Sequence, residues 1–383
     1  MKIWVIGRHY PAINNKMRGS FEIEQAKMLA RGGHDVTYIA VVFHPYKKIR
    51  KWGYSSWQED NINVFGYSHV FFPEKMKIQM SSFRARVFDK VLRKAEEKYG
   101  TPDIIHVHFP TMTVDAKPFF RFSEKGCKVV CTEHWSCVLT KELKNNQVLR
   151  LKRYVKGSDA FLCVGEPLKN SVIELTGTKK PVYVVPNVVA DMFVPGERKT
   201  DPGIFTFTMV ERIAPVKQTD KVIKAFYKIH KKHKNTRLML VGNGEIRLQI
   251  ENLVNKLGLN DSVEMTGTVK REEVVKRLAD SDCLLCYSKY ETFGVPIIEA
   301  WACGIPVISS NTVGLIGFWQ DDLGYLADPD DTNSLINKME LMLENRNDFS
   351  GEKIREYCMA NFSEKAVLAQ LEKLYNDIAD KNK

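Results

Sequence analysis

Two glutamates, Glu291 and Glu299, have seven residues between them, most of them apolar. A strand is expected before them, over 283–288, and a helix at 296–303, so both carboxylates can face one crevice at the carboxyl end of a parallel sheet. Carboxylates accept hydrogen bonds from hydroxyl groups, and the amides at a helix N-terminus hold phosphate. The loop residues between the glutamates include Phe293, Gly294 and Val295. The segment predicts a site for a sugar attached to phosphate.

Two cations follow another expected strand, over 204–210. Arg212 and Lys217 are one short loop apart, which suits the two phosphates of a diphosphate. Transfer of a sugar from such a donor requires the leaving diphosphate to be neutralised. The two groups of residues therefore point to the same chemistry.

Strand and helix patterns alternate along the chain, which predicts parallel α/β sheets. At 383 residues the chain is long enough for two domains. We expect domains at 1–190 and 203–362, joined by a hinge at 185–196 that is rich in turn-forming residues. The segment 363–383 has apolar residues at helical spacing and should form a helix that packs on the first domain. Strands are expected near 2–6, 34–41, 103–107, 127–132, 159–164, 181–185, 204–210, 236–241, 262–266, 283–288 and 305–309.

The segment from Glu291 to Glu299 resembles the E-x7-E motif of the retaining glycosyltransferases of family 4. Arg212 and Lys217 resemble the diphosphate-binding pair of that family, and 186–195 and 324–330 resemble its hinge and its late loop. The resemblance covers essentially the whole chain. It implies the GT-B fold, an α/β architecture in which two Rossmann-like, doubly wound domains face a central cleft.

Further site residues follow from this resemblance. It implies that His134, after the strand at 127–132, positions the transferred sugar, and that Gly19 and Ser20 belong to an N-terminal glycine loop. Gly267 and Val269 fall where the nucleotide base is expected to stack on the backbone. The family pattern has glycine where this chain has Ser20, Val188, Glu211 and Gln218. None of these departures removes a charged ligand.

We expect no metal and no cofactor. Asp328-Pro329-Asp330 matches the D-x-D of metal-dependent glycosyltransferases, but Asp and Pro here more simply begin the next helix. His106 and His108 alternate along a strand end, where His108 could approach the acceptor or be a buried core residue. Cys283 and Cys286 lie in an expected strand, where residues three apart face opposite sides, so a shared metal is disfavoured.

The net charge of +11 implies an acidic partner. Basic and aromatic residues cluster at 47–57 and 75–98, which suits an anionic membrane surface, or simply a solvated basic face. No apolar run approaches the roughly 18 residues of a membrane span, and the N-terminal apolar run is too short for a signal peptide. We therefore expect a cytoplasmic enzyme, with peripheral contact to the inner face of the cell membrane as an option.

Together these patterns favour a retaining, metal-independent hexosyltransferase of class EC 2.4. Its donor would be a nucleotide diphosphate sugar, UDP-linked in preference to GDP-mannose. Its acceptor would be a glycan or lipid-linked molecule of bacterial surface polysaccharide synthesis. A nucleotide-sugar epimerase of the same architecture is the alternative enzyme. A basic nucleic-acid-binding protein is disfavoured, because no nucleic-acid-binding motif accompanies the charge.

Overall fold

The computed structural model describes residues 1–10, 20–45, 53–71 and 77–380. The chain forms two compact units. The first comprises Met1–Val188 and Val367–Lys383, and the second Val189–Ala366. The boundary at Val188 lies two residues before the domain end expected from the sequence.

The first unit is built on an eight-stranded sheet in the order β3-β4-β2-β1-β5-β6-β7-β8. Every neighbouring pair is parallel except the β3–β4 hairpin. The strands are β1 (Lys2–Gly7), β2 (Asp35–Pro45), β3 (Gly53–Glu59), β4 (Ile62–Phe71), β5 (Ile104–His108), β6 (Lys128–Glu133), β7 (Ala160–Cys163) and β8 (Val182–Val184).

The β3–β4 hairpin was absent from the sequence-based prediction. β3 is an edge strand, and all its residues after Gly53 are exposed, so no buried run marked it. Its turn is Asp60-Asn61, with φ of 46° and 62°. A type I′ hairpin turn requires positive φ at both of its central residues, and this pair was the available signal.

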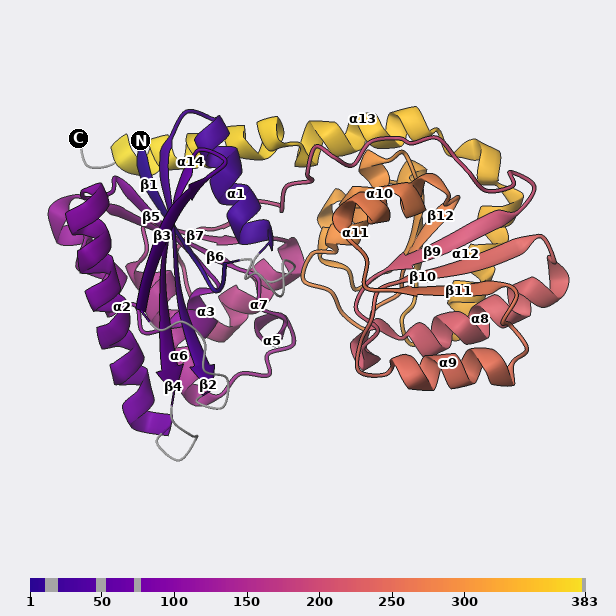
Figure 1. Ribbon diagram of the computed structural model, residues 1–383, viewed down its shortest axis with the longest axis horizontal. Coiled ribbons are helices and arrows are strands. Elements are labelled where there is room, and N and C mark those ends of the chain that lie inside the picture. Colours follow the sequence, from indigo (N-terminus) through magenta and orange to yellow (C-terminus); the bar gives the residue numbers. More distant parts are fainter. Residues whose placement is uncertain (11–19, 46–52, 72–76, 381–383) are drawn as a thin grey trace. The chain divides into compact units, whose positions relative to one another are not determined.

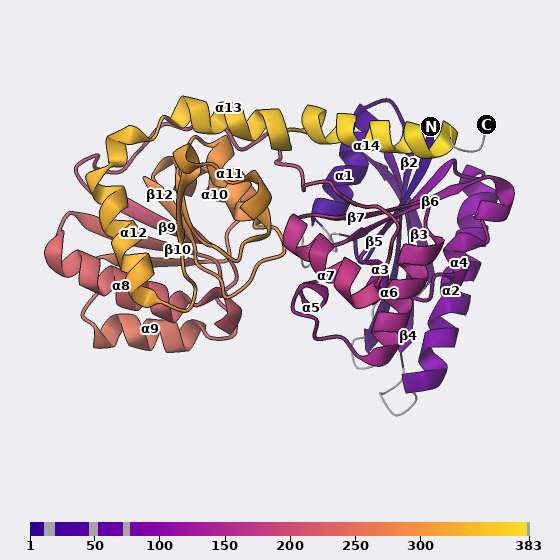
Figure 2. The same cartoon turned by 180° about the vertical axis from the view of Figure 1, so that it is seen from behind.

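Helices cover both faces of this sheet (Figure 1, Figure 2). α1 (Ser20–Arg31) and the C-terminal α14 (Glu364–Asp380) share one core with alternate residues of β1, such as Ile3 and Val5. On the opposite face, Trp4 stacks edge-on against Phe122. The remaining helices are α2 (Lys77–Tyr99), α3 (Pro110–Thr113), α4 (Lys117–Phe120), α5 (Ser136–Leu139), α6 (Asn145–Gly157) and α7 (Glu166–Thr176).

The second unit has a six-stranded, fully parallel sheet in the order β11-β10-β9-β12-β13-β14. Its strands are β9 (Phe205–Val210), β10 (Thr236–Val241), β11 (Val263–Gly267), β12 (Cys283–Cys286), β13 (Val307–Ser310) and β14 (Gly324–Ala327). Its helices are α8 (Thr219–Lys232), α9 (Arg247–Lys256), α10 (Arg271–Ala279), α11 (Val295–Ala302), α12 (Thr332–Glu344) and α13 (Gly351–Phe362). α8, α9 and α12 share one core with β9, and α10, α11 and α13 lie over the other face (Figure 1).

Each sheet has a point at which the chain reverses the direction of strand addition. In the first unit this point lies between β1 and β5, and in the second between β9 and β12. Loops that leave the carboxyl ends of two such strands diverge to opposite faces, and ligands of open α/β sheets bind in the crevice between them. The residues after β1, β5, β9 and β12 are therefore the ones that the fold presents for binding.

Candidate functional site

Lys217 lies between two carboxylates at the switch point of the second sheet. Its Nζ contacts Glu291 and lies 3.4 Å from Oε2 of Glu211. Glu211 directly follows β9, Lys217 ends a 3-10 turn over Pro215–Lys217, and Glu291 lies in the loop after β12. The two loops are also joined by a hydrogen bond of 2.8 Å from the amide of Lys289 to the carbonyl of Val216. The fold thus brings the sequence-predicted Lys217 and Glu291 together.

The electrostatics of this cluster follow from one cation facing two carboxylates. Burial raises the pKa of Glu211 to about 7, with Lys217 opposing the rise and Glu291 adding to it. Burial disfavours the charge on Lys217, but the fields of Glu291 and Glu211 outweigh it and raise the pKa of the ammonium. Lys217 therefore stays a cation at neutral pH, while Glu211 sits near its midpoint.

Arg212 is less constrained than Lys217. Its side chain is 72% exposed, and its Nε lies 3.0 Å from Oε2 of Glu245. The adjoining turn needs glycine, because a Cβ on Gly242 would lie 1.9 Å from the carbonyl oxygen of Glu211. The backbone beside Arg212 is therefore tightly packed. Its exposed side chain can still reorient toward an anion.

α11 begins beside this cluster. Gly294 precedes it with φ of 102°, a conformation that favours glycine. Val295 is its first residue, and Phe293 is buried against Phe362. The N-terminus of α11 has free backbone amides that can bind an anion.

Glu299 is buried within α11 and paired. Its Oε1 lies 3.3 Å from a terminal nitrogen of Arg271, at the start of α10. Burial raises the pKa of Glu299 to about 7, and Arg271 opposes the rise. Arg271 in turn lies 5.4 Å from the ring centre of Phe193. Arg271 therefore holds Glu299 in place, and the sequence-based prediction did not include this ion pair.

Gly267 and Val269 lie at the carboxyl end of β11 and in the loop after it. Gly267 has φ of 75°, and its carbonyl accepts a hydrogen bond of 3.0 Å from the amide of Gly242. Val269 is half-buried. The loops after β10 and β11 are thus joined at the same edge of the sheet as Lys217.

Several buried polar atoms near this edge lack a hydrogen-bond partner within the part of the chain that the structure describes. They are Oε1 of Glu211, Nε2 of Gln218, Oγ1 of Thr219 and Oγ of Ser288. Buried polar groups in proteins are normally satisfied by protein, water or ligand. Gln218 also has φ of 50°, which explains why glycine is common at this position in the family pattern.

In the first unit, His134 belongs to a buried cluster of hydrogen-bonded and stacked side chains. Its Nε2 lies 2.9 Å from Nδ1 of His108, and the ring of His108 stacks on that of His106. His106 bonds Thr132 at 2.6 Å and the hydroxyl of Tyr375, on α14, at 2.7 Å. Burial lowers the pKa of all three imidazoles, so they are neutral at pH 7. His108 is therefore a buried residue that contacts His134.

Glu133 organises the loop that carries His134, and the sequence-based prediction did not include it. Its buried carboxylate accepts hydrogen bonds from the amides of Thr111, His134 and Trp135 and from the hydroxyl of Thr111. These four hydrogen bonds hold the segments after β5 and after β6 against each other. The only signal in the sequence was its place at the end of a buried strand.

Arg8 is a second residue that the sequence-based prediction missed. It follows β1 at the switch point of the first sheet, and its guanidinium carbon lies 3.2 Å from the ring centre of Phe109, which follows β5. Its Nε bonds the fully buried Glu22 of α1 at 3.0 Å. Phe109 has φ of 50°, a strained backbone for a non-glycine residue. The fold thus presents a cation near His134.

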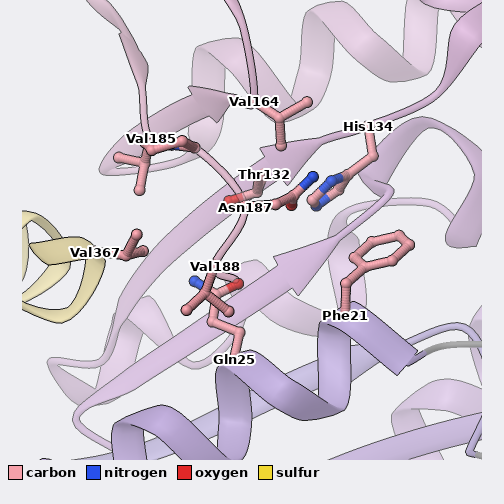
Figure 3. Close-up of a pocket in the computed structure, with 10 residues that line it drawn as sticks. Phe21, Gln25, Thr132, His134, Val164, Val185, Asn187, Val188 and Val367 are labelled. Atoms are coloured by element: carbon pink, nitrogen blue, oxygen red, sulfur yellow. The ribbon is translucent and has the colours of Figure 1, made fainter. Parts of the chain in front are cut away.

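A small pocket opens beside His134 (Figure 3). Phe21 and Gln25 of α1 line one side of it, and Thr132 and His134 line another. The other lining residues are Val164, Val185, Pro186, Asn187, Val188 and Val367. The lining thus combines the polar side chains of Gln25, Thr132, His134 and Asn187 with apolar ones.

Some predicted residues cannot be placed. Gly19 lies outside the described residues, and Ser20 is known only as the first residue of α1. Of the basic residues offered as a membrane contact, those at 47–51 also lie outside. Arg84, in the basic cluster at 75–98, is half-buried over Phe43, and its Nε is enclosed.

Within the described ranges, no group of three metal-ligating side chains is present. All eight cysteines are free. No described helix is long and apolar enough to span a bilayer.

Family models match both units of the chain. The model for glycosyl transferases group 1 matches residues 194–361, and that for glycosyltransferase family 4 matches 23–191. The chain belongs to glycosyltransferase family 4. The predicted family is thereby confirmed, and the enzyme is a glycosyltransferase of class EC 2.4.

Relatives and solved structures agree with this assignment. N-acetyl-alpha-D-glucosaminyl L-malate synthase of Bacillus anthracis is 27% identical over 97% of this chain and 97% of its own. The gpi3 component of phosphatidylinositol N-acetylglucosaminyltransferase of Schizosaccharomyces pombe is 24% identical over 73% of this chain and 62% of its own length.

Sucrose-phosphate synthase of Thermosynechococcus elongatus superposes with a TM-score of 0.80 at 20% identity over 99% of both chains. Anabaena Alr3699/HepE, in complex with UDP and glucose, gives 0.71 at 16% identity over 98% of this chain and 99% of its own. At these identities the structures establish the fold alone. The predicted GT-B fold of this family 4 glycosyltransferase is therefore confirmed.

Proposed function

We propose that this glycosyltransferase takes its sugar from a nucleotide diphosphate donor bound in the second unit, and that the transfer retains the anomeric configuration. The observation that carries the proposal is Lys217, an enclosed cation held against Glu291 at the carboxyl edge between β9 and β12. A fixed cation at this edge is suited to the diphosphate of a leaving group.

The cluster supplies what the transfer needs. Lys217 and the exposed Arg212 neutralise the charge that grows on the diphosphate as the bond from the sugar C1 breaks. Glu291 and Glu299 accept hydrogen bonds from sugar or ribose hydroxyls. In a retaining transfer at one face, the acceptor oxygen bonds C1 on the side that the phosphate leaves. The acceptor proton passes to a phosphate oxygen, so no side chain has to serve as the base.

The nucleotide is proposed to be UDP, and N-acetylglucosamine is the first sugar to test. The fold neighbour Anabaena Alr3699/HepE was solved with UDP and glucose. Two relatives are named for N-acetylglucosaminyl products or transfer. Metal independence belongs to the same proposal, because Lys217, Arg212 and the N-terminus of α11 together offer the positive field that a cation would supply.

The acceptor is proposed to bind the first unit near His134 and to carry negative charge. Malate and phosphatidylinositol, which the relatives' names mention, are both anionic. Arg8 supplies a cation near His134, and the chain has a net charge of +11. A glycan or lipid-linked acceptor of bacterial surface polysaccharide synthesis is proposed within this acidic class, at the inner face of the membrane.

A donor panel tests the proposal. The purified enzyme is mixed with UDP-N-acetylglucosamine, UDP-glucose, UDP-galactose and GDP-mannose, and released nucleotide is measured with and without malate, phosphatidylinositol and undecaprenyl phosphate. We expect UDP release that depends on one acceptor, and an α-linked product from an α-linked donor. Conversion of the donor sugar without any acceptor would identify an epimerase, and an inverted product would refute retention.

A further inference from the structure

Glu211 is a carboxyl that this chain adds to the proposed diphosphate site. The family pattern has glycine at its position. Its side chain is only 6% exposed, and its Oε2 lies 3.4 Å from Nζ of Lys217. Its Oε1 is buried and has no partner among the described residues. Glu211 is thus a buried carboxyl that places one unpaired oxygen beside the cation of the site.

The charges of the cluster conflict with an anionic ligand. If Glu211 and Glu291 are both ionised, they outweigh the single charge of Lys217 and leave a net charge of −1. Arg212 does not correct this balance in the described state, because it is paired with Glu245. A diphosphate that approaches Lys217 would then be repelled by two carboxylates, and the repulsion is smaller if one of them is neutral.

Glu211 is the carboxyl suited to hold the proton. Glu291 touches Lys217 directly and its side chain is 20% exposed, so it is both paired and open to water. Glu211 is more enclosed and farther from the ammonium, and burial raises its pKa to about 7. The thiol of Cys286, on β12, is the other titratable group beside it, and burial raises that pKa to about 12, so it stays neutral.

We propose that Glu211 takes up a proton when a diphosphate binds beside Lys217, and releases it when the nucleotide leaves. This inference rests on the proposed donor site. The proton comes from solvent and forms an O–H bond on the carboxylate, and no other bond changes. An approaching anion favours the neutral acid, so donor binding and protonation reinforce each other. Donor affinity should fall as the pH rises above neutrality.

Calorimetry with UDP tests this inference. The dissociation constant is measured between pH 7 and 8.5 for the wild type and for Glu211→Gln, which keeps the shape and removes the charge. The terminal phosphate of UDP, with a pKa near 6, is ionised throughout this range. We expect the wild-type constant to rise about tenfold, as linkage to a group of pKa near 7 requires. Glu211→Gln should vary little and bind more tightly at pH 8.5.

The matched control is Glu352→Gln, which changes an exposed glutamate of α13 and should follow the wild type. Proton uptake is measured independently for the wild type at pH 8, from binding heats in two buffers of different ionisation enthalpy. We expect close to one proton per UDP. A flat wild-type profile with no uptake would overturn the role of Glu211 and leave the donor site standing. If UDP, GDP and ADP all fail to bind, the donor site itself is wrong and this inference falls with it.

Discussion

Acid should destabilise the first unit through His106. This side chain is fully buried, bonded to Tyr375 and Thr132, and burial lowers its pKa to about 3. The unfolded chain binds a proton near pH 6.5, which the native imidazole does not. The native state therefore keeps its full stability above pH 6.5 and loses it progressively as the pH falls toward 3. At pH 5.5 the loss from this one group is about 1.4 kcal/mol.

The substitution His106→Gln isolates the contribution of His106 to the pH dependence of stability. His108 and His134 act in the same direction as His106, whereas burial raises the pKa of Glu22 and Glu133, which act in the opposite direction. A comparison of variants cancels these other groups. The variant loses hydrogen bonds and should be less stable at pH 7.5, but its deficit should shrink by about 1.4 kcal/mol at pH 5.5.

The assay is urea unfolding at pH 7.5 and at pH 5.5, monitored by hydrogen exchange in peptides of the first unit. Peptides of the second unit serve as an internal reference. His233→Gln, at an exposed position after α8, is the matched control and should leave the pH dependence of the first unit unchanged. A deficit for His106→Gln that is equal at both pH values, or larger in acid, would refute the assignment of a buried neutral imidazole.

Three further predictions concern turnover and location. Lys217→Met and Glu291→Gln should each lower turnover at least about 100-fold, because one removes the leaving-group charge and the other a sugar contact. The control Lys228→Met, at an exposed position on α8, should keep wild-type turnover. Full activity in a folded Lys217 or Glu291 variant would place the donor elsewhere. Turnover should persist in excess chelator, since side-chain cations and a helix N-terminus replace a metal; a loss restored by added metal would contradict this. Binding to anionic vesicles should weaken with salt and with charge reversal at Lys47, Lys48, Arg50 and Lys51, without a change in nucleotide affinity. A wild type that ignores such vesicles at low salt would leave the basic charge to a soluble acidic acceptor.

Much of the second unit could be predicted from local patterns. The expected strand at 236–241 coincides with β10, and the expected strand at 204–210 and helix at 296–303 match β9 and α11 within one residue. Buried parallel strands and amphipathic helices leave periodic signals in the chain itself. The ends of β9 and β12 could therefore be located, and with them the loops that bring Lys217 and Glu291 together.

The missed features depend on contacts between distant segments. Glu211 could be noticed as a departure from the family pattern, but its unpaired oxygen and its distance to Lys217 appear only in the folded unit. Likewise, Arg8 pairs with Glu22 and covers Phe109, which lies far along the chain. The β3–β4 hairpin was missed because an exposed edge strand carries no apolar alternation.

The central claim is that the nucleotide diphosphate binds beside Lys217 in the second unit. A crystal structure of the enzyme with UDP tests it most directly. The account predicts diphosphate oxygens within hydrogen-bond distance of Nζ of Lys217, with Arg212 turned from Glu245 toward the same phosphates. A diphosphate bound elsewhere, with the contact between Lys217 and Glu291 undisturbed and Arg212 still on Glu245, would contradict it.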